Sequence, residues 1–163
     1  MKIIKGTVLF LCMLLLFSAL GGCAALDVSH LERRAWKLNS MENVSMEFMN
    51  FDYEIVPRKD SFGLRGKAHI KKGAVPVWAE WVGELWIQGY LSDADGNVLA
   101  KGLQVFSPCS LDENLSIPFD FELKPDRLDS GPLFVSFGYR MVLQKNDKDN
   151  SEPFMAIERA VTH

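Results

Sequence analysis

The sequence predicts an all-β protein, built as an antiparallel β-sandwich of immunoglobulin-like or transthyretin-like kind, with an antiparallel barrel as the alternative. From residue 44 onward apolar and polar residues alternate, the period of two that is typical of strands with one buried face. These runs, about seven in number, are separated by turns rich in Gly, Pro, Asp and Asn. With 163 residues, 24% of them charged and 11% aromatic, the chain has the size and composition of one folded domain.

The first 22 residues have a different composition from the rest. Lys2 and Lys5 precede an apolar stretch over residues 7–20, which ends in two glycines, and no acidic residue occurs before Asp27. This is the layout of a secretory signal peptide, and we assign residues 1–22 to it. The apolar stretch is shorter than the ~20 residues that cross a bilayer as a helix. A retained membrane anchor is the alternative, because residues 21–26 add no charge.

A cysteine follows this leader in the run Leu20-Gly21-Gly22-Cys23. The run resembles the lipobox of bacterial lipoproteins, in which an aliphatic residue and two small residues precede an obligatory cysteine. The resemblance implies cleavage before Cys23, a thioether-linked diacylglycerol on its sulfur and acylation of its new amino group. Several acyl chains hold a protein stably at a bilayer, whereas one chain binds marginally. An ordinary signal peptide followed by a chance cysteine is the alternative.

The residue after Cys23 is Ala24 rather than Asp, which by the same resemblance favours the outer membrane, with the domain facing the periplasm. Cleavage would remove Lys2 and Lys5 and leave 16 basic against 21 acidic residues, a net charge of −5. This balance excludes the basic footprint of a nucleic-acid-binding protein and of a polybasic membrane binder. Cys109 would stay unmodified, and we expect it to pack as a small apolar side chain, with an intermolecular disulfide as the alternative.

Residues 23–43 are predicted to form a lipidated tether and a short helix. Ser29 with Glu32 three residues later is a capping-box pattern. Trp36 is expected to pack this segment onto the domain. Within this segment apolar residues recur at helical spacing, namely Leu31, Ala35 and Leu38.

Residues 44–163 are predicted to form the sandwich domain. The Asp93–Asn97 turn is the clearest hairpin signal, because Gly96 and Asn97 tolerate the positive φ that such turns need. It does not fit a calcium loop of the EF-hand type, since its twelfth position is Gln104 rather than Glu. Pro118 indicates an edge strand or the start of one. The expected strands are 44–55 with a bulge or bend near Met49, 62–70, 77–91, 98–106, 117–123, 133–144 and 154–161.

Aromatic residues gather in the strand expected over residues 77–91. A period of two places Trp78, Trp86 and Tyr90 on one face, while Trp81, Leu85 and Ile87 take the other. If the second face is core, the first is a candidate binding surface for protein or sugar. The alternative is that this strand is central and covered on both faces, or that the N-terminal helix lies over it.

No catalytic residue, metal ligand or cofactor site is predicted. The three histidines do not have the spacing of a zinc site, and the nucleophile elbow, P-loop and dinucleotide-binding patterns are absent from the sequence. A glycosidase-type carboxylate pair stays open at four positions, namely Glu80, Glu84, Asp120 and Glu122.

The sequence therefore favours a non-enzymatic lipid-anchored envelope protein that acts as a protein-binding or assembly accessory module. Its expected partners are the membrane, through lipid on Cys23, and an envelope protein, and nucleic acid is not expected. The alternative is a carbohydrate or cell-wall binding module that uses Trp78, Trp86 and Tyr90. A periplasmic hydrolase is the third and weakest hypothesis.

Overall fold

The protein is all-β in the part of the chain that its structure, a computed structural model, describes. The twelve strands there pair with each other in antiparallel fashion throughout, and this part of the chain contains no helix. The antiparallel all-β class predicted from the sequence is thereby confirmed. The leader and Cys23 lie outside the described residues, which are 25–112, 115–126, 131–148 and 151–162.

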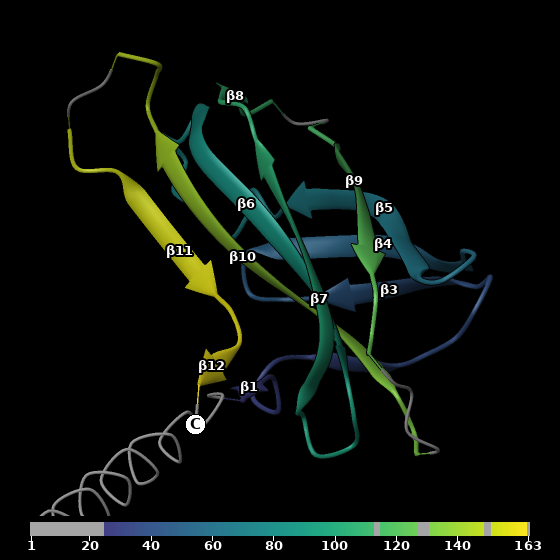
Figure 1. Cartoon of the computed structure of the whole chain (residues 1–163). Helices are drawn as coiled ribbons and strands as arrows, with labels where there is room; N and C mark the ends of the chain where they lie inside the picture. The colour runs from purple at the N-terminus through teal and green to yellow at the C-terminus, as the bar shows by residue number, and fades with distance from the viewer. Residues whose placement is uncertain (1–24, 113–114, 127–130, 149–150, 163) are drawn as a thin grey trace, which may run out of the picture.

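Two large sheets face each other in a sandwich-like arrangement (Figure 1). The β4 sheet has the order β3 (Met41–Ser45), β4 (Met49–Pro57), β5 (Phe62–Ile70), β9 (Ile117–Leu123). The β6 sheet has the order β11 (Phe154–Glu158), β10 (Phe134–Gln144), β6 (Trp81–Ser92), β7 (Val98–Phe106). Short strands extend it, with β2 (Arg33–Ala35) on β10 and β8 (Cys109–Ser110) on β6. A separate pair joins β1 (Leu26–Asp27) to β12 (Val161–Thr162).

The inner faces of the two sheets share one apolar core. Phe51 of β4 stacks on Phe137 of β10 with ring centroids 4.3 Å apart, and Tyr53 meets Phe137 edge-on. This contact joins strands from opposite sheets. The alternation read from the sequence of β10 is present without a break, since its inward residues are all fully buried, namely Val135, Phe137, Tyr139, Met141 and Leu143.

A pair of inward-facing glycines brings β7 and β9 close together along one side of the core. Gly89 and Gly102 lie opposite each other on β6 and β7. A Cβ atom on Gly102 would lie 2.7 Å from the Cβ of Phe121, and one on Gly89 would lie 3.0 Å from the Cδ2 of the same ring. The Phe121 ring thus takes the space that two side chains would otherwise fill.

Most strands lie where the sequence predicts them, with three differences. The bend predicted near Met49 is a tight turn between two strands, β3 and β4, in which the Met46 amide donates to the Met49 carbonyl over 2.9 Å. The strand expected from residue 77 begins at Trp81. The last predicted strand is divided into β11 and β12.

The predicted N-terminal helix is wrong, because this segment forms β1, β2 and β3. β11 pairs with β10 only from Tyr139 onward, so the earlier part of that edge of β10 is free to accept β2. Ser29 does not cap a helix, since its hydroxyl donates to Oδ1 of Asp27 over 2.5 Å. Trp36 does pack the segment onto the body, through an edge contact with Phe62 at 5.0 Å.

The hairpin predicted at Asp93–Asn97 is confirmed, and it joins β6 to β7. Gly96 adopts a φ of 98°, which a residue with a side chain rarely reaches. The Asp93 carboxylate accepts the backbone N–H groups of Asp95 and Asn97 at 2.9 Å. Burial raises the pKa of Asp93, but the hydrogen bond from the Asn97 side-chain amide, together with those from the backbone N–H groups of the turn, outweighs it and holds that pKa below its usual value.

Candidate functional site

The outer face of the β6 sheet is the surface on which the sequence placed its candidate site. Pairing register defines a row of side chains across four strands, since Trp86 of β6 lies opposite Arg140 of β10 and Val105 of β7. Arg140 in turn lies opposite Ile157 of β11. The neighbouring row contains Glu84 and Val142, and Arg140 forms an ion pair with Glu84 between the rows.

Apolar side chains stand on both borders of this face. Leu103 and Val105 on β7, and Met155 and Ile157 on β11, are 46–67% exposed. Between them Trp86 and Val142 are half-buried. We call these six residues the apolar patch. Exposed apolar surface around a charged pair is typical of protein-binding sites. When a partner removes such surface from water, the free energy of the complex is lowered.

The other end of the same face is covered by the protein itself. Tyr90 is only 1% exposed, and its hydroxyl accepts the Ala160 N–H at 3.2 Å and donates to Oε1 of Gln88. Val28 of the N-terminal segment is fully buried and its N–H donates to the Gly96 carbonyl. Burial raises the pKa of Tyr90. The phenol therefore serves to fix the C-terminal segment to the sheet.

The structure separates the three aromatic residues of the predicted binding face. Trp86 lies in the apolar patch. Trp78 is 40% exposed and belongs to the loop before β6, and Tyr90 lies beneath Ala160. Trp81, the first residue of β6, is half-buried. Of the three, Trp78 and Trp86 therefore have side chains that are partly exposed to solvent, whereas the side chain of Tyr90 is covered.

Sequence reasoning missed the four exposed residues of the patch. In the middle of β7 the inward residues are the smaller or more polar ones, since Ala100, Gly102 and Gln104 face the core while Leu103 and Val105 face out. The sequence analysis places a strand here but assigns no face to its residues. The orientation becomes visible only in the pairing of Gly102 with Gly89 and in the contact of Gly102 with Phe121.

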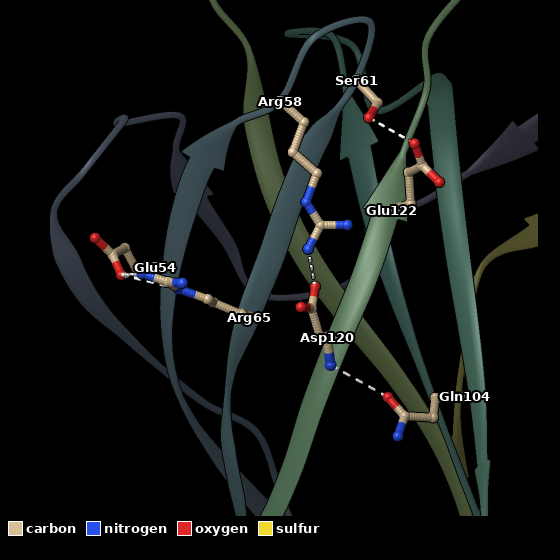
Figure 2. A network of polar contacts seen from close by, with 7 residues as sticks. All are labelled: Glu54, Arg58, Ser61, Arg65, Gln104, Asp120 and Glu122. Atoms are coloured by element: carbon tan, nitrogen blue, oxygen red, sulfur yellow. Dashed lines mark hydrogen bonds and ion pairs between the residues drawn. The ribbon is translucent and has the colours of Figure 1, made fainter.

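The outer face of the β4 sheet is charged, and its charges neutralise each other (Figure 2). Arg58 reaches over Gly63 to pair with Asp120 of β9 at 2.5 Å, and Arg65 pairs with Glu54 at 3.0 Å. An open depression of about 860 Å³ on this face is lined by both signs of charge. Exposed ion pairs of this kind add little stability, so they keep the face polar rather than hold the fold.

Of the carboxylates left open as an acid–base pair, Asp120 and Glu122 share the outer face of the β4 sheet, whereas Glu84 lies on the outer face of the β6 sheet. Glu84 pairs with Arg140 on the β6 sheet. Asp120 and Glu122 belong to the β4 sheet, where Glu122 accepts the hydroxyl of Ser61 at 2.6 Å. Glu80 precedes β6, and its carbonyl accepts the Leu111 N–H. In the described part of the chain no three His, Cys, Asp or Glu side chains converge as metal ligands do.

Cys109 is half-buried in β8 and forms no disulfide within the part of the chain that the structure describes. Burial, and then the charge of Asp112, raise the pKa of its thiol. The thiolate is the reactive form of cysteine, so this environment makes the thiol less nucleophilic at neutral pH.

Comparison of the chain with protein-family models, with curated proteins and with solved structures finds no match. Among the described residues, no helix is long and apolar enough to span a bilayer.

Proposed function

We propose that this is a non-enzymatic protein of the bacterial cell envelope, anchored by lipid on Cys23 and acting as an assembly or accessory factor that binds a protein partner. The apolar patch carries the proposal. Its exposed side chains border both sides of the β6 sheet and surround a half-buried Trp86 and the Arg140–Glu84 pair. An apolar surface with an aromatic residue and an arginine at its centre has the composition of a protein interface.

The anchor is supported by the Leu20-Gly21-Gly22-Cys23 run at the end of an apolar leader. Ala24 favours the outer membrane, with the body in the periplasm. Mass spectrometry of the protein purified from membranes should find diacylglycerol on Cys23 and no leader. The Cys23→Ser variant should carry no lipid, and a wild-type protein with an unmodified thiol would disprove the anchor.

The partner surface can be tested with two matched substitutions. Val105→Asp places a charge in the apolar patch, whereas Val77→Asp places the same charge on a side chain that is 99% exposed outside the sheets. We expect a photo-crosslinker at position 103 to capture an envelope protein whose purified form binds the chain again. Val105→Asp should weaken that binding at least tenfold, because a buried unpaired charge costs more than about 1.4 kcal/mol. Equal loss with Val77→Asp would refute the proposed surface.

A carbohydrate or cell-wall ligand is the second candidate, and the position of Trp86 favours it. The indole lies on an open face next to Arg140, with Gln88 two residues further along the same face. An aromatic ring beside planar hydrogen-bonding groups is suited to bind a sugar ring. Titration with peptidoglycan fragments should change the tryptophan fluorescence of the wild type and of Trp78→Phe, but not of Trp86→Phe. A flat response of the wild type would remove this candidate.

The specific type of β-sandwich is a further part of this proposal. We assign the arrangement to the immunoglobulin-like or transthyretin-like sandwiches, supported by the two antiparallel sheets around one core and by the non-consecutive neighbours β6–β10 and β5–β9. Superposition of an experimental structure on both types would decide between them.

A further inference from the structure

A second depression, of about 430 Å³, lies between β12 and the outer face of the β6 sheet. Lys101 of β7 stands opposite Tyr90 in the pairing register, and Arg159 lies just before β12. The lining contains these two cations and no acidic side chain. We call it the cationic pocket. Its lining residues are Leu26, Gln88, Tyr90, Lys101, Arg159, Ala160, Val161 and Thr162.

The charge of this pocket is opposite in sign to that of the mature chain, which is −5 after cleavage. The larger depression on the β4 sheet differs, since four carboxylates line it beside two cations. Neither Lys101 nor Arg159 forms an ion pair with any residue that the structure describes. The charge of Arg159 acts on the hydroxyl of Tyr90, another lining residue, where it opposes the effect of burial on the pKa. Two unneutralised cations beside hydrogen-bonding groups make a site for an anion.

The chain enters the fold at this pocket. Leu26 lines it and follows Cys23 by only three residues. Three residues span at most about 11 Å even when fully extended, so lipid on Cys23 would hold this end of the body at the headgroups. Exposed apolar side chains lie beside the cations, since Val161 lines the pocket and Leu103 lies opposite Gln88. The anion that is most concentrated at that position is the phosphate of the bilayer itself.

We propose that the cationic pocket binds the phosphate group of an anionic phospholipid in the bilayer to which the chain is anchored. The inference rests on the proposed anchor at Cys23 and adds a defined orientation to it. The β1–β12 end faces the headgroups, and the apolar patch stands at the membrane surface, open to a partner in the same membrane. Each cation near an anionic bilayer contributes about 1 kcal/mol, which corresponds to about a fivefold change in occupancy.

The test uses the full lipidated protein in vesicles of phosphatidylcholine, with or without phosphatidylglycerol, and measures hydrogen exchange of residues 98–105 and 155–162. Lys101→Gln with Arg159→Gln removes both cations of the pocket. Arg65→Gln with Lys67→Gln is the matched control, because it removes the same charge from the outer face of the β4 sheet. A parallel sample holds inorganic phosphate with phosphatidylcholine vesicles alone.

Protection in the wild type should rise several-fold when phosphatidylglycerol is present, and high salt should remove the rise by screening. The pocket variant should lose it and the control should keep it. Three results would overturn the inference while the anchor stands. The wild type could be protected equally with and without phosphatidylglycerol, or the control variant could lose as much protection as the pocket variant. Inorganic phosphate with phosphatidylcholine vesicles could also give the full protection. Absence of lipid on Cys23 would overturn the anchor and this inference together, and the mass spectrum shows which case holds.

Discussion

Two buried tyrosines on the inner faces differ in the partners of their hydroxyls. Tyr139 of β10 donates to Oε1 of Glu158 at 2.5 Å and accepts the Phe48 N–H at 3.3 Å, so it joins β11 to the β3–β4 turn. Tyr53 of β4 is equally buried, but its hydroxyl has no hydrogen-bond partner among the residues that the structure describes. Burial, and then Glu158, raise the pKa of Tyr139, and burial raises the pKa of Tyr53 to about 12.

Replacing each tyrosine by phenylalanine should therefore have opposite consequences. Tyr139→Phe leaves the Glu158 carboxylate and the Phe48 amide short of a partner, and should lower the free energy of unfolding by about 1 to 3 kcal/mol. Tyr53→Phe removes a buried hydroxyl that has no partner, and should leave stability unchanged or raise it. Urea denaturation of both variants measures the difference. Equal destabilisation would contradict the hydrogen-bonding difference between them.

At the scale of elements, the Gly89–Gly102 pair sets how closely β9 approaches the β6 sheet. Gly102→Ala should lower the unfolding free energy by about 1 to 3 kcal/mol, because its Cβ would meet Phe121 in a packed core. Gly73→Ala is the control, since nothing lies within 4 Å of the added atom. Thermal denaturation compares the two, and adding Phe121→Leu should restore part of the loss. A neutral Gly102→Ala would show that β7 and β9 are not in close contact.

The N-terminal segment packs onto the sandwich through a buried side chain. Val28 is fully buried, and its N–H is bonded to the β6–β7 turn. Val28→Ala should cost about 1 to 3 kcal/mol, whereas Val77→Ala, at an almost fully exposed position, should stay within about 0.5 kcal/mol of the wild type. Chemical denaturation of both variants decides this. If Val28→Ala proves as mild as its control, the segment does not pack on the sheet in solution.

The sequence predicts the elements well where local chemistry determines them. Phe62–Ile70, Val98–Phe106 and Ile117–Leu123 begin and end where alternation and turn residues place them. The N-terminal segment could not be predicted in this way, because β2 forms where β10 offers an edge that no other strand occupies, and β1 forms by pairing with the distant β12. The spacing of Leu31, Ala35 and Leu38 is helical, yet β2 gains pairing that local propensity does not encode.

The candidate site was predictable only in part, for the same reason. Sequence reasoning selects Trp86, which does lie on an open face, but it includes Tyr90, which the distant Ala160 covers. It misses Leu103 and Val105 because larger apolar residues are expected to face inward. In this chain β9 approaches so closely that β7 must turn its glycine toward the core. That contact joins residues far apart in the sequence, and a single sequence does not show it.

At the scale of the whole molecule, the two outer faces of the sheets are suited to different tasks. The β4 sheet presents ion pairs that neutralise each other, and such a surface has little to gain from a partner. The β6 sheet presents the apolar patch and the cationic pocket, and the chain segment that follows Cys23 enters on this side. The proposed partner surface, the proposed anchor and the proposed headgroup contact thus fall on one side of the molecule, which is the arrangement expected for a partner in the same membrane.

Buried phenols in both sheets make the stability of the whole fold sensitive to alkali. Tyr53, Tyr90 and Tyr139 have pKa values raised in the folded state, while in the unfolded chain they titrate near pH 10. Above that pH the unfolded chain releases protons that the folded chain keeps, so stability is complete below pH 10 and falls as the pH rises through the folded-state values. Tyr53 alone accounts for a loss of about 2 kcal/mol between pH 10 and pH 12. Denaturant midpoints measured across this range should fall less steeply in Tyr53→Phe than in the wild type, although lysine titration affects both alike. Parallel curves for the two proteins would mean that the Tyr53 hydroxyl reaches water in the folded state.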